Sequence, residues 1–502
     1  MTKTRSTVLV FLVLAGAIVA VHGPGLTALP QWDVMHYLVE RQAWPTFNEA
    51  IHRLDYSLAR RYWKGDEGQY RPLLLLLVAA EYEVFGYDIR GWHAVNIGLH
   101  LVVAFLLYRV LSRHLARDLA LALSLLFAVM YASVGLVQVA WVGGYMAGCA
   151  LLLIALQTAW AQLRQGNTTG LTGWLPYALC MMLAAFFFEV FVVYSVLLAV
   201  CFRLSLRSRG LTPSRSLAAL WLLPVFVFTA IYVPRIFVAP RLLYVDDLPS
   251  SNLLAEAHLT TYVWRAGEFF GRWSATTAMP TIRPLVMAFV DGHLLAEPFR
   301  ILAMLVNAGA LLVVAALVWK QSRHQWPSDA RWKFVTLTVL LVGYVAFVRF
   351  GRERTDETHR YLFALLAVLM LGTLFEASRL ADRTRTIVIG ALLVLAVINA
   401  ERSQDLTSRT GREGADYVHY LSSLHRFVRA HQREPAFSFH VDADPLFLQP
   451  LDLVEGYPDR PIRVTQTYLW ETFHGAVRDR AGAAYLLRWD GKDLVVRTND
   501  VR

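Results

Sequence analysis

The sequence is dominated by apolar runs that are each long enough to cross a membrane as a helix. A transmembrane helix needs about 20 mainly apolar residues to span a hydrocarbon core of about 30 Å. Of the 502 residues, 56% are hydrophobic and only 17% are charged. We therefore expect an all-α polytopic membrane protein with about 11 transmembrane helices. The eleven predicted spans are residues 6–21, 92–111, 118–137, 144–163, 172–187, 190–204, 216–234, 300–319, 334–350, 361–378 and 385–400.

The positions of the basic residues predict how these spans are oriented. Cytoplasmic loops of membrane proteins are enriched in Lys and Arg. With a cytoplasmic N-terminus, 17 basic and 4 acidic residues lie in cytoplasmic ends and loops, so the net charge of +10 reflects topology. No extramembrane block is strongly basic, which argues against nucleic acid as a partner. Only five of the 48 basic residues are lysine, a bias common in GC-rich bacteria, and we expect an integral protein of a bacterial inner membrane.

Residues 174–202 are almost continuously apolar and can be interpreted as one long span or as two. At about 1.5 Å per residue a single helix would be roughly 43 Å long, which exceeds the hydrocarbon core. A single span would also place the basic loop 320–333 outside the cytoplasm. The enrichment of basic residues inside therefore favours a tight hairpin with Glu189 at its outer tip.

This topology divides the chain into two parts. A membrane module, residues 1–400, carries three outer loops at 22–91, 235–299 and 350–360. Residues 401–502 alternate polar and apolar positions with Gly and Pro breaks, which predicts a small soluble α/β domain in the periplasm or outside the cell. Within it we expect an amphipathic helix at 413–431, a strand at 436–442 and a hairpin over 483–498.

Ionisable residues are concentrated at the outer ends of the spans. The middles of the spans are nearly free of charge, although His100 lies about two turns into its span. A transporter would be expected to keep ionisable groups or broken helices near the middle of the membrane. The pattern instead predicts polar chemistry at the outer membrane boundary. The residues that gather there are Asp33, His36, Arg71, Glu81, Glu189, Arg352, Arg354, His359 and Arg360.

Several of these residues lie in motifs that resemble the GT-C superfamily of membrane glycosyltransferases. The resemblance covers about residues 6–400 in order and spacing. It includes the protein O-mannosyltransferases that use polyprenyl- or dolichyl-phosphate sugars, and related bacterial envelope sugar transferases. The matching features are Asp33 after the first span, Tyr70-Arg71-Pro72-Leu73, Phe85-Gly86, Val95-Asn96 with His100, Glu189, and Thr358-His359-Arg360-Tyr361-Leu362.

The chain also departs from the O-mannosyltransferase pattern. That group has two adjacent acids after its first span, whereas only Asp33 stands here, and the Lys that precedes its conserved Glu is replaced by Phe188. The helical repeats that follow its spans are replaced by the small mixed domain. The acceptor therefore stays open, because transferases that act on bacterial lipid A or the cell envelope share the same plan.

The resemblance implies an inverting glycosyltransferase that moves a sugar from a polyprenyl-phosphate donor to a hydroxyl acceptor on a protein, lipid or glycan. The reaction would occur at the non-cytoplasmic face of the bilayer. Asp33 matches the catalytic acid of the family in position and would act as the base. Arg71, Arg360 and Arg352, or Arg354 in its place, would bind the donor phosphate. The predicted substrate cavity is lined by His36, Tyr70, Asn96, His100, Glu189, His359 and Tyr361.

Each of these roles has a simpler alternative. Asp33 could cap an interfacial helix, Arg71 could anchor a helix end in the interface, and Glu189 could pair with an arginine. Asn96 and His100 share one helix face and would more often be interhelical hydrogen-bond partners.

For the whole chain, the alternatives to an enzyme are a transporter of lipid-linked glycans and a non-catalytic membrane scaffold. We expect no certain cofactor. Asp33 and His36 could share a divalent cation, but two ligands do not define a metal site.

Overall fold

The computed structural model describes most of the predicted spans and parts of the tail. The described residues are 3–28, 71–85, 89–138, 143–233, 327–350, 357–434, 437–443, 446–448, 461–463, 476–477, 480–490 and 492–499. The predicted span 300–319 and the outer loop 235–299 lie outside them.

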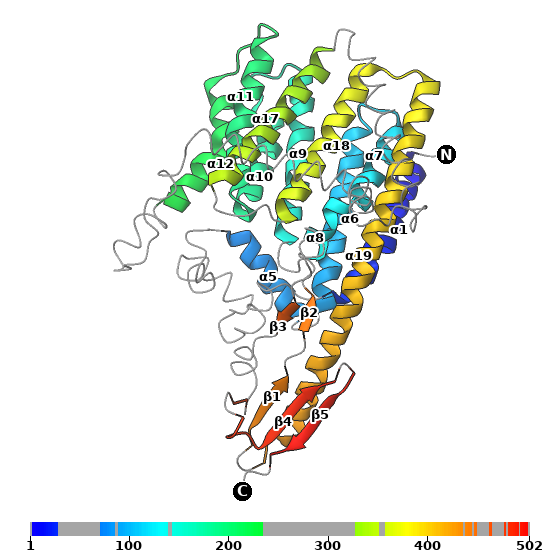
Figure 1. Cartoon of the computed structure of the whole chain (residues 1–502). Helices are drawn as coiled ribbons and strands as arrows, with labels where there is room; N and C mark the ends of the chain where they lie inside the picture. The colour runs from blue at the N-terminus through cyan, green and yellow to red at the C-terminus, as the bar shows by residue number, and fades with distance from the viewer. Residues whose placement is uncertain are drawn as a thin grey trace.

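The described part of the chain is a bundle of helices with a small sheet at one end (Figure 1). We call the end that carries α5 and faces the sheet the sheet end, and the end formed by the turns 112–116, 165–170, 208–214 and 379–381 the turn end. The helices are α1 (Lys3–His22), η1 (Gly23–Thr27), α5 (Pro72–Phe85), α6 (Ile89–Leu111), α7 (Arg117–Val129), α8 (Tyr131–Gln138), α9 (Gly143–Arg164), α10 (Leu171–Phe187), α11 (Val190–Arg207), α12 (Arg215–Val233), α17 (Ser328–Phe350), α18 (Glu357–Ser378) and α19 (Asp382–His431).

Helices lie at the predicted spans that the structure describes, with 118–137 divided between α7 and α8, and α5 is a further helix that was not predicted as a span. In the described residues, six helices are long and apolar enough to cross a membrane, and two further apolar helices, Leu171–Phe187 and Arg215–Ile231, are shorter. A polytopic helical protein is therefore confirmed, whereas the number of eleven spans stays a prediction. The six are Thr7–Thr27, Arg90–Leu111, Gly143–Arg164, Val190–Arg207, Tyr361–Ser378 and Asp382–Asp416.

The run 174–202 forms two antiparallel helices, as the charge pattern predicted. α10 ends at Phe187 and α11 begins at Val190, so only Phe188 and Glu189 make the turn. Phe188 is extended, with φ −152° and ψ 137°, which reverses the chain within two residues. The turn lies at the sheet end, close to α5 (Figure 1).

The predicted span 118–137 is broken into α7 and α8 at Met130, so the prediction of one continuous helix there is wrong. Met130 has φ −65° and ψ 133°, outside the helical region. The break removes the helical partner of the Ala128 carbonyl, which instead accepts hydrogen bonds from His22 Nε2 at 3.3 Å and His100 Nε2 at 3.0 Å. Since a carbonyl oxygen only accepts, both rings carry a proton on Nε2.

Polar side chains of α19 satisfy the other backbone groups at this break. Ser403 Oγ donates to the carbonyl of Val129 at 3.0 Å, and the amide of Tyr131 donates to Asn399 Oδ1 at 3.3 Å. Backbone that leaves the helix inside a membrane protein is tolerated where neighbouring helices supply such partners. The break is thus held by α1, α6 and α19 together.

The interior of the bundle is packed with aromatic side chains between α10, α11 and α12. Trp174, Tyr177, Phe202 and Trp221 are almost completely buried. The ring centroids of Trp174 and Trp221 are 5.1 Å apart, and those of Tyr177 and Phe202 are 5.3 Å apart. Because lipid tails are as apolar as these side chains, such close packing rather than escape from water holds membrane helices together.

α19 is one helix of 50 residues that continues past the end of the predicted last span. It joins that span to the predicted amphipathic helix of the tail, so no break separates residues 1–400 from 401–502 in the described backbone; the domain division itself stays a prediction. α19 packs against the end of α1, where Thr407 Oγ1 donates to the Val21 carbonyl at 2.5 Å, and against η1, where Thr27 Oγ1 donates to the Gly411 carbonyl at 2.6 Å.

The end of α19 packs against a three-stranded sheet with the order β1-β4-β5. β1 (Phe439–Ala443) is parallel to β4 (Tyr485–Trp489), which is antiparallel to β5 (Leu494–Thr498). The predicted hairpin is confirmed. The strand predicted at 436–442 is also present, but it begins three residues later, at Phe439. A separate antiparallel pair is formed by β2 (Leu446–Leu448) and β3 (Pro461–Arg463). The small core between helix and sheet contains Tyr420, Leu424, Phe427, Phe439, Val441 and Leu487.

Candidate functional site

Arg71 and Glu189 form an ion pair at the sheet end of the bundle. Arg71 Nε lies 3.0 Å from Glu189 Oε2 and 3.3 Å from Oε1, and the two side chains are 12% and 16% exposed. Pro72 starts α5, a position where its missing N–H costs no hydrogen bond, and this places Arg71 just before the helix. The prediction that Glu189 pairs with an arginine is confirmed.

The ion pair with Glu189 uses Nε of Arg71 and leaves the two Nη groups to bind another acceptor. Arg71 Cζ lies 4.2 Å from the centroid of the Phe188 ring, which stacks beneath the cation. Within the described part of the chain, the hydrogen bonds of Arg71 to Glu189 use Nε alone. The two Nη groups therefore remain as a fork that can hold a carboxylate or phosphate.

Asn96 and His100 hold helices together at the break between α7 and α8. Asn96 Nδ2 donates to the carbonyl of Val137 at 3.2 Å, and His100 Nδ1 accepts from the Tyr361 hydroxyl at 2.8 Å. All three side chains are completely buried. Asn96 and His100 are therefore interhelical hydrogen-bond partners, as their shared helix face indicated. Direct contact of Asn96, His100 or Tyr361 with a substrate stays a prediction.

Of the other predicted site residues, the structure describes His359 and Arg360 but not the rest. Arg360 and His359 lie in the first turn of α18, immediately before Tyr361. The proposed base Asp33, and with it His36, Tyr70, Arg352 and Arg354, lie outside the described residues. In the described ranges no group of three His, Cys, Asp or Glu side chains is arranged to hold a metal ion, and a cation at Asp33 and His36 stays a prediction.

Glu81, which had no predicted role, is buried on α5, the helix that begins directly after Arg71. Its side chain is 4% exposed, and neither carboxyl oxygen has a hydrogen-bond partner among the described residues. Burial raises the pKa of Glu81 to about 8. α5 belongs to the predicted outer loop 22–91, so this carboxyl is predicted to lie near the outer membrane boundary. The only signal in the sequence was an acid interrupting an apolar run, and such a perturbed, unpaired acid marks a candidate functional residue.

Burial of Glu81 is expected to make the folded protein less stable as the pH rises. The folded pKa of about 8 exceeds the ordinary value of 4.5. Between these values the unfolded chain loses a proton that the folded chain keeps, so the free energy of unfolding falls from about pH 4.5 to 8. Glu81→Gln removes this loss, and its melting temperature relative to the wild type should be higher at pH 8 than at pH 5.

Glu83→Gln is the matched control, because Glu83 lies on the same helix and is exposed. Its melting temperature should follow the wild type at both pH values. A Glu81→Gln profile that also runs parallel to the wild type would contradict a buried, unpaired Glu81.

Together the fold and the ion pair define a polytopic helical membrane protein with a cationic fork at one end of the bundle. No family model matches the sequence, and no curated protein is significantly similar to it. Among solved structures, the chain is similar to the crystal structure of ArnT from Cupriavidus metallidurans bound to undecaprenyl phosphate. The two share 12% identity over 97% of this chain and 94% of that chain, with a TM-score of 0.49.

With 12% identity and a TM-score of 0.49, the likeness to ArnT carries no argument about the family of this chain. It assigns neither a substrate nor residue roles to this protein.

Proposed function

We propose that the protein is an inverting glycosyltransferase that uses a polyprenyl-phosphate sugar at the non-cytoplasmic face of the membrane. The observation that carries the proposal is the mostly buried Arg71, held through Nε by Glu189 with its Nη fork left over. A buried arginine oriented in this way suits the phosphate of a lipid whose tail lies in the bilayer. The Tyr70-Arg71-Pro72-Leu73 motif supports the same assignment through its resemblance to GT-C enzymes.

The proposed reaction is a single displacement at the anomeric carbon. The acceptor hydroxyl oxygen bonds to that carbon while the bond from the carbon to the phosphate oxygen breaks. Asp33 takes the hydroxyl proton, and the polyprenyl phosphate leaves as an anion. The leaving group needs cations rather than a proton, a role we give to Arg71 with Arg360 and Arg352.

The buried polar residues support this site instead of reacting in it. Asn96, His100 and Tyr361 fasten α6 to α8 and α18. His36, Tyr70 and His359 are proposed to orient the acceptor. The topology that serves this reaction has a cytoplasmic N-terminus and the C-terminal sheet on the periplasmic side, in keeping with the basic residues of the turn end.

Incubation of the purified protein in nanodiscs with radiolabelled polyprenyl-phosphate sugars and a membrane extract as acceptor tests the proposal. The enzyme should release free polyprenyl phosphate and label the acceptor. A transporter would move the intact labelled lipid without breaking a covalent bond, and a scaffold would do neither. Either of the last two results would overturn the assignment.

Arg71→Gln is expected to raise the KM for the donor by about 10- to 100-fold, because a charge-assisted pair with the phosphate is lost. The KM for the acceptor should change little. The substitution also leaves Glu189 without its cation, so a loss of stability must be separated from a loss of binding.

The double variant Arg71→Gln/Glu189→Gln makes this separation. Removing both charges should restore much of the stability lost in Arg71→Gln, but not donor binding. If the double variant regains the donor KM as well, Arg71 serves the fold alone and does not bind phosphate.

A further inference from the structure

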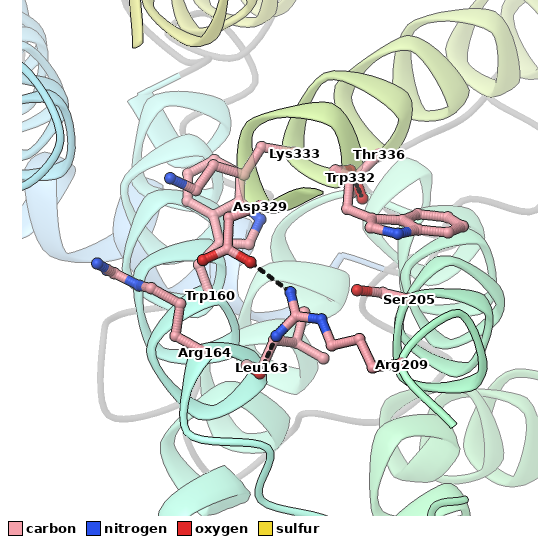
Figure 2. A pocket seen from close by; sticks show the side chains of 9 residues that line it. All are labelled: Trp160, Leu163, Arg164, Ser205, Arg209, Asp329, Trp332, Lys333 and Thr336. Atoms are coloured by element: carbon pink, nitrogen blue, oxygen red, sulfur yellow. Dashed lines mark hydrogen bonds and ion pairs between the residues drawn. The ribbon is translucent and has the colours of Figure 1, made fainter. Parts of the chain in front are cut away.

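A second polar site lies at the turn end, away from the Arg71–Glu189 pair. It is a pocket, open to solvent, between the ends of α9 and α11 and the start of α17 (Figure 2). Its walls combine basic, hydroxyl and aromatic side chains. The lining residues are Trp160, Leu163, Arg164, Ser205, Arg209, Asp329, Trp332, Lys333 and Thr336.

Three cations line this pocket against one carboxylate. Arg209 Nη2 pairs with Asp329 Oδ1 at 2.5 Å, and Arg209 Nη1 donates to the Leu163 carbonyl at 2.9 Å. Lys333 Nζ lies 2.7 Å from both oxygens of Glu376, which is outside the lining. Arg164 is exposed and makes no ion pair with any residue that the structure describes, so positive charge is left over.

Neighbouring groups do not cancel the excess of positive charge. Burial, followed by the charges of Lys333, Arg164 and Arg113, lowers the pKa of His114 to about 3. His114 is therefore neutral at pH 7, and its contact of 3.7 Å with Glu376 is not an ion pair. Glu376 is left to balance Lys333 alone. The general enrichment of basic residues in cytoplasmic loops explains cations at this end, but it does not explain their convergence on a pocket.

Two buried donors in the pocket also lack partners. Ser205 is 2% exposed, and its Oγ forms no hydrogen bond within the part of the chain that the structure describes. Other buried serines in these helices, such as Ser124 and Ser195, donate to the carbonyl four residues earlier at 2.9 Å. The Oγ of Ser205 is instead directed into the pocket (Figure 2). Nε of Arg209 is likewise buried without a hydrogen bond.

We propose that this pocket binds the phosphate group of an anionic molecule, through Arg164, Arg209 and Ser205. Phosphate oxygens accept several hydrogen bonds at once and carry the charge that the cations leave unbalanced. Basic pockets between membrane helices bind phospholipid head groups in this way, and a soluble phosphate offers the same chemistry. The proposal is independent of the glycosyltransferase reaction, since the pocket lies at the opposite end of the bundle from Arg71.

The full-length protein in detergent, with phosphatidylglycerol or inorganic phosphate added, tests the proposal. Thermal unfolding and native mass spectrometry would measure binding, with phosphatidylcholine as the neutral lipid. We expect saturable stabilisation by at least one phosphate probe but not by phosphatidylcholine. Arg164→Gln should weaken the apparent Kd about tenfold. Ser205→Ala should weaken it severalfold without lowering the melting temperature of the ligand-free protein, because the hydroxyl it removes has no partner.

Arg207→Gln is the matched control, because Arg207 is exposed at the same end of α11 and does not line the pocket. Its Kd should equal that of the wild type. Binding of phosphatidylglycerol alone identifies a lipid source for the phosphate, and binding of inorganic phosphate identifies a soluble one. No binding of either, or equal weakening by Arg164→Gln and Arg207→Gln, would overturn the proposal. These readouts do not depend on sugar transfer.

Discussion

Gly414→Ala is expected to lower the free energy of unfolding by about 3 kcal/mol, among the largest effects of any single methyl group in the chain. A Cβ at Gly414 would overlap the carbonyl oxygen of Thr27, and one at Gly411 would overlap that of Pro24. Both obstacles are backbone atoms of η1, which cannot rotate away as a side chain would. The long helix α19 must therefore separate from η1, and the Thr27–Gly411 hydrogen bond would be lost with it.

Gly390→Ala in the same helix separates this effect from helix propensity. No atom lies within 4 Å of the Cβ that this change would add. It should leave the melting temperature unchanged or raise it slightly, since alanine favours a helix over glycine by up to about 1 kcal/mol. Thermal unfolding in detergent compares the two. Equal melting temperatures for Gly414→Ala and Gly390→Ala would contradict the close approach of α19 and η1.

Asp33→Asn is expected to reduce sugar transfer by about 10²- to 10⁴-fold, the usual contribution of a general base. The amide is nearly the same size as the carboxylate but cannot take the proton of the acceptor hydroxyl. The rate at saturating donor and acceptor should fall, while the melting temperature stays close to that of the wild type. The rate is measured as release of free polyprenyl phosphate.

Two comparisons make the Asp33→Asn result specific. Glu83→Gln, which removes an exposed carboxylate on α5, should transfer sugar at the normal rate. Arg71→Gln should act mainly through the donor KM. Retained turnover in Asp33→Asn would remove Asp33 from the mechanism and leave the base unassigned.

The helices could be predicted because hydropathy and charge are properties of the local sequence. The turn at Phe188 and Glu189 followed from the placement of basic loops alone. The break at Met130 could not be predicted, because no Pro or Gly stands there and the freed Ala128 carbonyl is satisfied by His100 and other side chains distant in sequence. The continuation of α19 beyond residue 400 was missed for a related reason. Residues 401–412 are polar, so hydropathy ends there, whereas packing against α1 and η1 keeps the segment helical.

The candidate site shows the same division between local and tertiary information. The four-residue spacing of Asn96 and His100 correctly predicted a shared face, but not that the face closes a break in another helix. The sequence predicted that Glu189 pairs with an arginine but not with which one. Only the fold identifies that arginine as Arg71. Burial of Glu81 depends on which neighbours cover it, which no pattern in its own helix records.

The uninterrupted length of α19 determines how far the sheet lies from the start of this helix. At about 1.5 Å per residue its 50 residues extend about 75 Å, and a bilayer core takes up only about 30 Å of that. The remainder is a rigid rod with the sheet fixed to its tip. A change of about 10° in the tilt of its membrane segment would swing that tip by about 13 Å. A small change in the tilt of α19 within the bundle would thus displace the sheet by a much larger distance.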